Sequence, residues 1–323
     1  MRRLSERQQQ LLHLLADGQF HPGPQIGEAL GISRAAVSQQ LKGLRELGVE
    51  LHSVSGKGHK LALPIQLLDA QRLQQDLLEA PVQVLAVIDS TNHFMMSQLD
   101  RWQKGECVLA ECQTAGRGRR GRQWHSPFGS QLILSLFWRL EQGMASAMGL
   151  SLVVGIALVE ALESQGLAGI KVKWPNDLYL DGRKLAGILV EMAATVGGAC
   201  QMVVGVGMNL QLPLGEAQKI DQPWAELQTL VGEGRLDRHR LTCAVVRQLR
   251  QCLTRFEQEG MAPFVARWNE LDLYRDQPVR LISGERSWHG IARGIDSQGA
   301  LLLENEAGEL QTLVGGEISL RPR

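Results

Sequence analysis

The sequence lacks the cysteine patterns of disulfide-rich and zinc-binding proteins. Its 323 residues include five cysteines, an odd number, and they are widely spaced without a C-x-x-C pair. Such spacing does not indicate a disulfide framework, and we find no grouping of cysteine with histidine that suggests zinc. We expect five reduced and mostly buried thiols, as is usual in the cytoplasm.

The sequence also lacks segments typical of membrane or secreted proteins. Its longest apolar stretch, around residues 149–162, is too short to span a bilayer and contains Glu160. The first residues, Met1 to Ser5, lead into a Gln-rich amphipathic segment and not into the apolar core of a signal peptide. We therefore expect a cytoplasmic protein with no membrane partner.

An overall charge is missing as well, because 34 Lys and Arg residues balance 34 Asp and Glu residues. No field of the whole chain therefore attracts it to DNA or to a membrane. The charges are uneven, however: residues 1–64 carry 8 basic and 5 acidic side chains, and the remainder carries 26 and 29. The first 64 residues are thus the part best suited to contact nucleic acid.

Finally, the chain has none of the short motifs of covalent or metal catalysis. It contains no G-x-S-x-G, no H-E-x-x-H, no Walker A lysine and no catalytic pairing of cysteine with histidine. Mechanisms that depend on a protein nucleophile, on a bound catalytic metal or on redox chemistry are therefore not indicated.

What the sequence does contain is a basic, glycine-rich segment at residues 116–122, with four arginines and three glycines. Arginines supply forked donors for phosphate and carboxylate oxygens, and glycines let the backbone approach a ligand. The segment also matches G-x-G-x-x-G, but the turn-rich residues after it do not fit the helix that a dinucleotide site needs. An anion clamp and a plain basic surface loop both remain open on this segment alone.

The N-terminal residues 1–64 have the pattern of a winged helix-turn-helix domain. Helices are expected at 5–16, 24–30 and 34–47, followed by a hairpin at 51–63 with a basic tip. Polar and basic side chains lie on the outward face of the third helix, and a small helical interaction domain is the alternative. The predicted DNA contacts are Ser33, Arg34, Ser38, Gln39, Lys42 and Lys57.

Residues 65–271 form the expected central domain, in which strands group around few helices. This order predicts an α+β fold with a mixed or antiparallel sheet. The expected strands are 82–88, 107–111, 132–138, 171–174, 178–180, 183–191 and 201–210, and the expected helices are 65–80, 90–99, 146–165, 221–230 and 238–259.

The last part, residues 272–323, changes to short strands separated by turns. They are expected at 279–283, 287–293, 301–304, 310–313 and 318–320. Five short strands in so few residues predict a small SH3-like barrel.

Polar and charged residues that could carry chemistry follow several central strands. Positive charge and polar positioning without a nucleophile suit phosphoryl or nucleotidyl transfer to a carboxylate. Each residue has a plainer alternative: Lys184 as a surface lysine, Asp177 as part of a turn and not a Mg²⁺ ligand, Trp124 as core. The group comprises Ser90, Thr91, Asn92, Gln113, the basic loop, Lys173, Asn176, Asp177, Lys184 and Asn209.

Five motifs in this order resemble those of bacterial biotin–protein ligases. With the N-terminal winged helix, the chain is similar to the bifunctional members, which are both ligase and biotin-operon repressor. The resemblance covers essentially the whole chain. The motifs are residues 89–92 (DSTN), 113–124 (QTAGRGRRGRQW), 173–177 (KWPND), 183–191 (RKLAGILVE) and 205–209 (GVGMN).

This resemblance implies a central domain like that of class II aminoacyl-tRNA synthetases and a two-step reaction. Biotin and ATP, with Mg²⁺, would give biotinyl-5′-AMP, and the biotinyl group would pass to a lysine of biotin carboxyl carrier protein. The adenylate would also act as corepressor, so that a homodimer of the loaded protein binds operator DNA.

The resemblance also implies roles for individual residues. Lys184 and Arg119 would be catalytic, and Asp177 a candidate Mg²⁺ contact. Biotin would be held by Ser90, Thr91, Asn92, Gln113, Gly116, Arg117, Gly118, Arg119, Lys184 and Gly187. The nucleotide would be held by Arg117, Arg119, Arg120, Arg122, Trp124, Lys173, Asn176, Asp177, Asn209 and Trp224.

Some positions depart from the family pattern, and two other functions compete with the first. His125 stands where an aromatic often follows the tryptophan, and residues 211–223 do not match the family loop closely. One alternative is a related acyl-adenylate ligase for lipoate. The other is a transcription factor whose central domain only senses a ligand.

Overall fold

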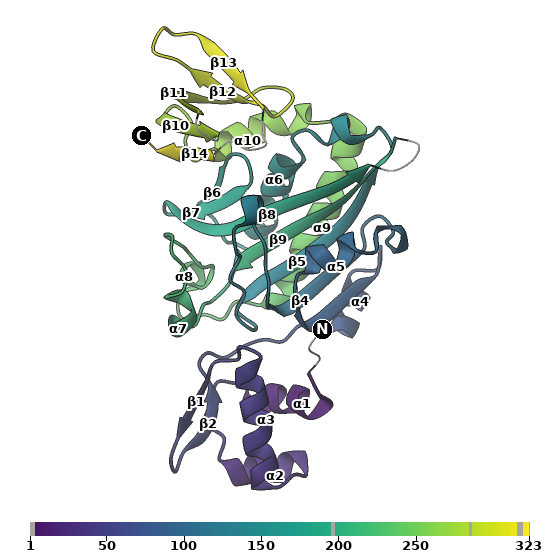
Figure 1. Ribbon diagram of the computed structural model, residues 1–323, viewed down its shortest axis with the longest axis vertical. Coiled ribbons are helices and arrows are strands. Elements are labelled where there is room, and N and C mark those ends of the chain that lie inside the picture. Colours follow the sequence, from purple (N-terminus) through teal and green to yellow (C-terminus); the bar gives the residue numbers. More distant parts are fainter. Residues whose placement is uncertain (1–3, 195–197, 284–285, 315–318, 323) are drawn as a thin grey trace.

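The computed structural model describes residues 4–194, 198–283, 286–314 and 319–322. It places the N-terminal helical domain at one end, a large central sheet with helices in the middle, and a small group of strands at the other end (Figure 1). Ile318, at the start of the last expected strand, lies outside the described residues. The expected α+β class with a mixed sheet is confirmed.

The N-terminal domain consists of three helices and a two-stranded hairpin, as expected. The helices are α1 (Glu6–Leu15), α2 (Gly23–Leu30) and α3 (Arg34–Glu46), and the strands are β1 (Leu51–Val54) and β2 (Gly58–Leu61). Ser5 and Ser33 cap α1 and α3 by accepting backbone hydrogen bonds, and Gly31 ends α2 in a left-handed conformation. These caps set the tight turn between α2 and α3.

The apolar core of this domain extends into the central domain. Leu11, Leu41 and Leu44 of the helices belong to the same buried cluster as Cys112 and Phe128 of the central domain. Burial of apolar surface contributes about 25 cal/mol per Å². The two domains are therefore held by a shared core as well as by the connecting chain.

The central sheet has seven strands in the order β3-β4-β5-β9-β8-β7-β6. Strands β3 and β4 are parallel, and each other neighbouring pair is antiparallel. The strands are β3 (Val82–Ile88), β4 (Cys107–Gln113), β5 (Gln131–Leu140), β6 (Ile170–Lys173), β7 (Asp177–Leu180), β8 (Arg183–Ala194) and β9 (Cys200–Asn209).

Helices pack on both faces of this sheet. Leu134 and Leu136 of β5 lie in the core with α6 (Leu150–Glu163) and α9 (Arg238–Glu259), while Phe137 lies with Met95 of α5 (Thr91–Met96). Because successive side chains of a strand point to opposite faces, α6 and α9 cover one face and α5 the other. Figure 1 shows α6 and α9 behind the sheet and α5 in front.

One helical stretch, Met144–Glu163, is long and apolar enough to cross a membrane by composition. It comprises the 3₁₀ turn η3 (Met144–Ala147) and α6, and 67% of its apolar window is buried inside the protein. A helix that is apolar nearly all round is expected where it is enclosed on all sides. The stretch therefore belongs to the core of the central domain.

The C-terminal strands form a second, antiparallel sheet in the order β13-β12-β11-β10-β14. Helix α10 (Val265–Leu271) and the turn η4 (Ala262–Phe264) connect it to α9. The strands are β10 (Pro278–Ser283), β11 (Arg286–Ile295), β12 (Leu301–Glu304), β13 (Leu310–Leu313) and β14 (Ser319–Pro322).

Two helix predictions need correction. The helix expected at 221–230 is wrong: the structure has only the short α7 (Leu214–Ala217) and α8 (Gln228–Val231) in this region. The chain at Pro223–Ala225 is extended because it pairs with Lys184, whose N–H donates to Pro223 O and whose carbonyl accepts from Ala225 N. A tertiary backbone interaction thus outweighs the local pattern.

The helix expected at 65–80 is shorter in the structure and forms α4 (Ala70–Asp76). Asp69 caps it by accepting hydrogen bonds from Gln71 N and Arg72 N. The residues before it bond elsewhere: Ile65 N donates to Ala16 O of the N-terminal domain, and Leu68 N donates to Glu111 of the central domain. The connection is therefore not helical up to Asp69.

Candidate functional site

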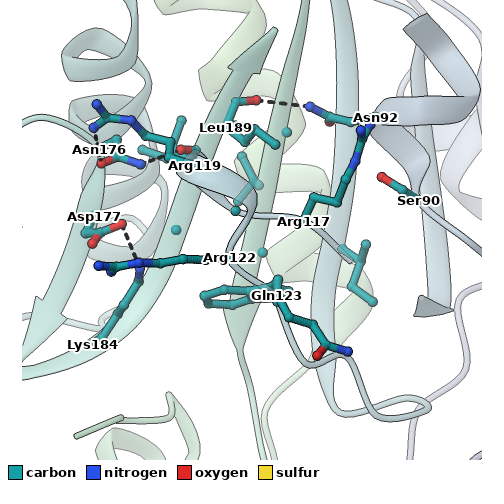
Figure 2. A pocket seen from close by; sticks show the side chains of 18 of the residues that line it. Ser90, Asn92, Arg117, Arg119, Arg122, Gln123, Asn176, Asp177, Lys184 and Leu189 are labelled. Atoms are coloured by element: carbon teal, nitrogen blue, oxygen red, sulfur yellow. Dashed lines mark hydrogen bonds and ion pairs between the residues drawn. The ribbon is translucent and has the colours of Figure 1, made fainter. Parts of the chain in front are cut away.

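One cavity in the central domain collects nearly all residues that the sequence singles out. It opens beside β8 and β9 at the basic loop, and Figure 2 shows side chains that line it, with some of their interactions. The predicted residues that line it are Ser90, Thr91, Asn92, Gln113, Arg117, Gly118, Arg119, Arg120, Arg122, Trp124, Lys173, Asn176, Asp177, Lys184 and Gly187.

The first region of the cavity is a polar end at the start of α5. Ser90 caps this helix, and Gln113 Oε1 accepts from both Thr91 N (2.8 Å) and Thr91 Oγ1 (3.1 Å). The buried Ser135 hydroxyl lies 2.7 Å from Thr91 Oγ1 and 2.5 Å from Asn92 Oδ1. These groups offer both donors and acceptors, so the end suits a compact ligand head group with both kinds of atom.

Asn92 is held in one orientation by its amide nitrogen. Nδ2 donates to the Leu189 carbonyl at 3.1 Å (Figure 2) and to Glu191 Oε2 at 2.9 Å. These bonds turn Oδ1 toward Ser135 and fix which atoms face the cavity. Glu191 also lies 3.6 Å from an Arg117 nitrogen, and so it joins the polar end to the basic loop.

The floor of the cavity is a strip of the sheet without side chains. A Cβ at Gly205 would lie 2.3 Å from Asn92 Oδ1, and one at Gly207 would lie 2.5 Å from Trp124 Nε1. Gly187 lies opposite Gly207 in the register of β8 and β9. Such distances leave no room for a methyl group, so these glycines are required where Asn92 and Trp124 lie on the sheet.

The basic loop folds over the cavity as a narrow hairpin. Gly118 N donates to Arg122 O at 2.7 Å, and Trp124 N donates to Gly116 O at 2.8 Å. A Cβ at Gly116 would lie 2.4 Å from Trp124 O, which explains the glycine at this position. Arg120 adopts a positive φ of 58°.

Arg119 is the most deeply placed arginine of the loop. Its guanidinium donates to Asn176 Oδ1 at 3.0 Å (Figure 2). Burial lowers its pKa from the usual value, the charges of Arg120 and Arg122 lower it further, and Asp177 opposes them. A half-buried cation among like charges is a site where a ligand anion binds favourably.

Lys184 and Asp177 face each other at the far side of the cavity. Lys184 Nζ lies 2.9 Å from Asp177 Oδ1 and 5.6 Å from the centre of the Trp124 ring. Its backbone is held on both sides by Pro223 and Ala225. The ammonium is therefore fixed at the wall and can stabilise negative charge that develops on a bound ligand.

The charge of the lining decides what the cavity can bind. Among the described lining residues, six carry positive charge and Asp177 alone carries negative charge. An excess of cations in a partly enclosed space favours an anion with several oxygens, such as a phosphate ester or a carboxylate. Lys173 belongs to this set but is buried, with Nζ donating to the Tyr179 hydroxyl at 3.1 Å.

Three predicted residues are not among those that line the cavity. Gly116 is enclosed beneath the loop. The buried Asn209 accepts from Gln131 and donates to the Ala225 carbonyl, so its amide joins two protein segments. Trp224 pairs with Lys184 through its backbone and lines a separate, shallow hollow.

Four residues of the site were assigned no role from the sequence, although Glu191, Gly205 and Gly207 lie within the quoted motifs. They are Ser135, Glu191, Gly205 and Gly207, which complete the polar end and the floor. Glycines at alternate positions of an apolar strand, as in Gly205-Val-Gly207, are a signal that could have identified the floor. Nothing in the local sequence of Ser135 distinguishes it.

The expected DNA-contacting residues are exposed on α3, at its cap and on the hairpin of the N-terminal domain. Arg34, Ser38, Gln39 and Lys42 are exposed along α3, exposed Ser33 caps it, and Lys57 is exposed in the β1–β2 turn. Arg45 donates to Ser53 Oγ at 2.6 Å and thereby fastens the hairpin to α3. The arrangement presents a helix and a wing together.

Three family models match consecutive parts of the chain. Residues 84–209 match the Biotin/lipoate A/B protein ligase family, residues 276–321 match the Biotin protein ligase C terminal domain, and residues 7–60 match an HTH domain. The three matches follow the three parts of the fold.

Similar proteins span the whole chain. The Bifunctional ligase/repressor BirA of Salmonella typhimurium is 51% identical over 311 residues, 96% of each chain, and that of Escherichia coli is 50% identical over the same share. The solved structure of biotin protein ligase from Aquifex aeolicus in complex with biotin and ATP aligns with a TM-score of 0.64 at 27% identity. It covers 75% of this chain and 99% of that one.

Proposed function

Because the chain belongs to the family of bifunctional biotin ligase/repressors, we infer that it joins biotin to a carrier protein with ATP and represses transcription through its N-terminal domain. The observation that carries the ligase activity is the cavity with a polar end, six cationic side chains and the Lys184–Asp177 pair. No protein nucleophile is needed, since the substrates supply every reacting atom.

In the first step, a biotin carboxylate oxygen attacks the α-phosphorus of ATP and pyrophosphate leaves with the electron pair of the broken P–O bond. In the second, the amine of a carrier lysine attacks the carbonyl carbon, loses a proton, and AMP leaves. Negative charge develops on phosphate and carboxyl oxygens in both steps. Lys184 and Arg119 are placed to stabilise this charge, which is the main source of catalysis in such reactions.

The polar end of the cavity supports biotin as the carboxylic acid substrate. The ureido ring of biotin has two N–H donors and one carbonyl acceptor, and Ser90, Thr91, Asn92 and Gln113 present complementary groups. The dithiolane ring of lipoate has no N–H group, so it would leave these polar atoms unsatisfied. Biotin is therefore preferred over the lipoate alternative.

The nucleotide is proposed to lie between the basic loop and the Lys173–Asp177 turn. Arg117, Arg119, Arg120 and Arg122 reach the phosphates, while Trp124 and Asn176 border them. Asn209 and Trp224 act from behind the wall, by holding the backbone on both sides of Lys184.

Mg²⁺ fits the cavity through Asp177, because this ion is usually held by one or two carboxylates together with substrate phosphates. Asp177 is the acidic group among the described lining residues. When bound, the ion supplies charge neutralisation at the phosphates. Asp177 itself also orients the Lys184 ammonium.

Biotin-dependent exchange of pyrophosphate into ATP tests the proposed activity. Exchange that requires biotin supports it, and exchange with lipoate in place of biotin selects the alternative ligase. If neither acid supports exchange, the remaining alternative is a transcription factor whose central domain only senses a ligand.

We further propose that the adenylate-loaded protein forms a homodimer that binds an operator with two winged helices. The exposed residues of α3 and the β1–β2 turn support this, because a helix in the major groove and a wing on the backbone are the usual contacts of this motif. Expected finer features are an SH3-like closure of the C-terminal sheet, a class II synthetase-like central domain, and a cytoplasmic location.

Replacing Arg34 or Lys42 by Ala is expected to weaken operator binding and to lower the slope of log affinity against log salt by about 1. Each change removes one exposed cation from α3. Titration of a labelled operator at several salt concentrations, with biotin and ATP present, measures both effects. Arg7→Ala, which removes an exposed arginine from α1, is the matched control, and equal losses in all three variants would contradict the proposed surface.

Replacing Glu191 by Ala is expected to raise KM for biotin by ~10-fold with kcat nearly unchanged, the loss typical of a hydrogen bond to a charged group. The change removes one of the two acceptors of Asn92 Nδ2, leaving the Leu189 carbonyl, and it removes a partner of Arg117. Steady-state biotinylation at varied biotin concentrations measures KM and kcat separately. Glu141→Ala, at an exposed ion pair, is the control; an unchanged KM would show that Glu191 does not position the polar end.

A further inference from the structure

A second group of chemically active side chains lies away from the cavity, where α4 meets α9. It comprises Asp76 at the end of α4 and His239 and Cys243 on α9. His239 and Cys243 are four residues apart on a helix and therefore share one face. The third member, Asp76, lies far from the other two in the sequence, so the group forms only in the folded chain.

We propose that Asp76, His239 and Cys243 form a binding site for a zinc-like divalent transition-metal ion. The three ligand atoms lie within 4.8 Å of one another. Imidazole, thiolate and carboxylate are the ligands that Zn²⁺ takes, and three protein ligands leave one position for water. The exposed side chain of Asp76 places that position toward solvent.

The distances agree with such a site. Zinc bonds of about 2.0–2.1 Å to nitrogen and 2.3 Å to sulfur, at a tetrahedral angle, separate the two atoms by about 3.6 Å. Cys243 Sγ lies 3.7 Å from His239 Nε2. Asp76 Oδ2 lies 2.7 Å from the same nitrogen, as in a hydrogen bond, and the exposed carboxylate has to withdraw by about 0.6–0.7 Å to reach the tetrahedral separation.

The orientation of the His239 ring determines which of its nitrogens faces the other two ligands. Nε2 faces both Asp76 and Cys243, whereas Nδ1 is buried without a hydrogen-bond partner among the residues that the structure describes. The imidazole therefore interacts through the one nitrogen that faces the other two ligands.

The surrounding charges are compatible with the ion. A divalent cation with one carboxylate and one thiolate has no net charge, so nearby Arg72 and Arg247 do not repel the loaded site as a whole. Arg247 already donates to the backbone oxygen of Asp76 at 2.6 Å. Burial raises the pKa of the Cys243 thiol.

The ion would fasten α4, the first helix after the interdomain connection, to α9. Next to the site, Gln66 of the connection accepts from Arg238 N at 2.8 Å. A metal here would stabilise the side of the central domain that receives the DNA-binding domain, away from the substrate cavity. The inference does not rest on the proposed ligase activity.

Titration of the full-length protein with Co²⁺ tests the site, because a thiolate ligand gives a charge-transfer band and tetrahedral Co²⁺ gives intense visible bands. We expect both bands at one equivalent, and Zn²⁺ should abolish them and raise Tm. Cys243→Ser should lose the charge-transfer band and Asp76→Asn, at an exposed position, should bind more weakly. Cys252→Ser, a buried thiol on the same helix, should behave like the unmodified protein.

Absence of the bands, or a charge-transfer band of equal strength in Cys243→Ser, would overturn the proposal. If Cys243→Ser does not fold, Asp76→Asn decides the question, since a metal affinity equal to that of the unmodified protein would also overturn it. Biotinylation should be unaffected by Zn²⁺ in either variant, which separates this test from that of the ligase.

Discussion

Lys184→Ala is expected to slow adenylate formation by ~10²–10³-fold, the loss typical of one donor that stabilises developing charge. The ammonium lies at the cavity wall, 2.9 Å from Asp177, and its backbone is held by Pro223 and Ala225. It can therefore act on charge at the carboxylate and α-phosphate without moving. Biotin-dependent pyrophosphate exchange measures the first step, and transfer from preformed adenylate measures the second, which should also slow.

The loss could also arise because Asp177 is left without its partner. Asp177→Ala and the double variant separate the two causes, since a shared role makes the combined loss smaller than the product of the single losses. Lys171→Ala is the matched control, because this exposed lysine on β6 donates to the Glu270 carbonyl outside the cavity. Near-normal exchange in Lys184→Ala would remove Lys184 from the mechanism.

The elements predicted best from the sequence are those with a strong local pattern. Strand β3 and helix α9 have the bounds expected for them, since one is an apolar run interrupted only by Gln83 and the other is a long amphipathic segment. The expected helix at 221–230 failed because Pro223–Ala225 pairs with Lys184. That interaction joins distant residues and leaves no trace in the local pattern.

The site residues, too, divide into those marked by a local motif and those defined by contacts between distant segments. Motif residues at strand ends could be predicted to gather, because parallel neighbours end at the same edge of the sheet and the end of one antiparallel strand lies beside the start of the next. The residues that were missed depend on neighbours brought close by folding. Ser135 looks like any other serine of a strand, and Gly207 is explained only by the Trp124 indole that lies on it. Asn209 belongs to a motif, yet its side chain joins protein segments behind the cavity.

Replacing Arg119 by Gly is expected to weaken retention of the adenylate by ~10–100-fold, the range for a hydrogen bond between charged groups. Arg119 is the loop arginine that reaches Asn176, so it joins the loop to the opposite wall of the cavity. Without it, the loop is held by its own backbone bonds and by the longer Arg117–Glu191 ion pair, and water and foreign amines reach the mixed anhydride. Rapid filtration of labelled adenylate measures the release rate.

A second expected effect of Arg119→Gly is the loss of selectivity for the carrier protein. Released adenylate reacts with any exposed lysine, so biotin should appear on bystander proteins such as serum albumin while carrier biotinylation declines. Arg120→Gly is the matched control: it removes an exposed arginine from the same loop at a positive φ that suits glycine, and it should release far less. If both variants retain the adenylate as tightly as the unmodified protein, closure does not depend on the Arg119–Asn176 contact. If both release it equally, the loop acts through its total charge, and the particular position of Arg119 is unimportant.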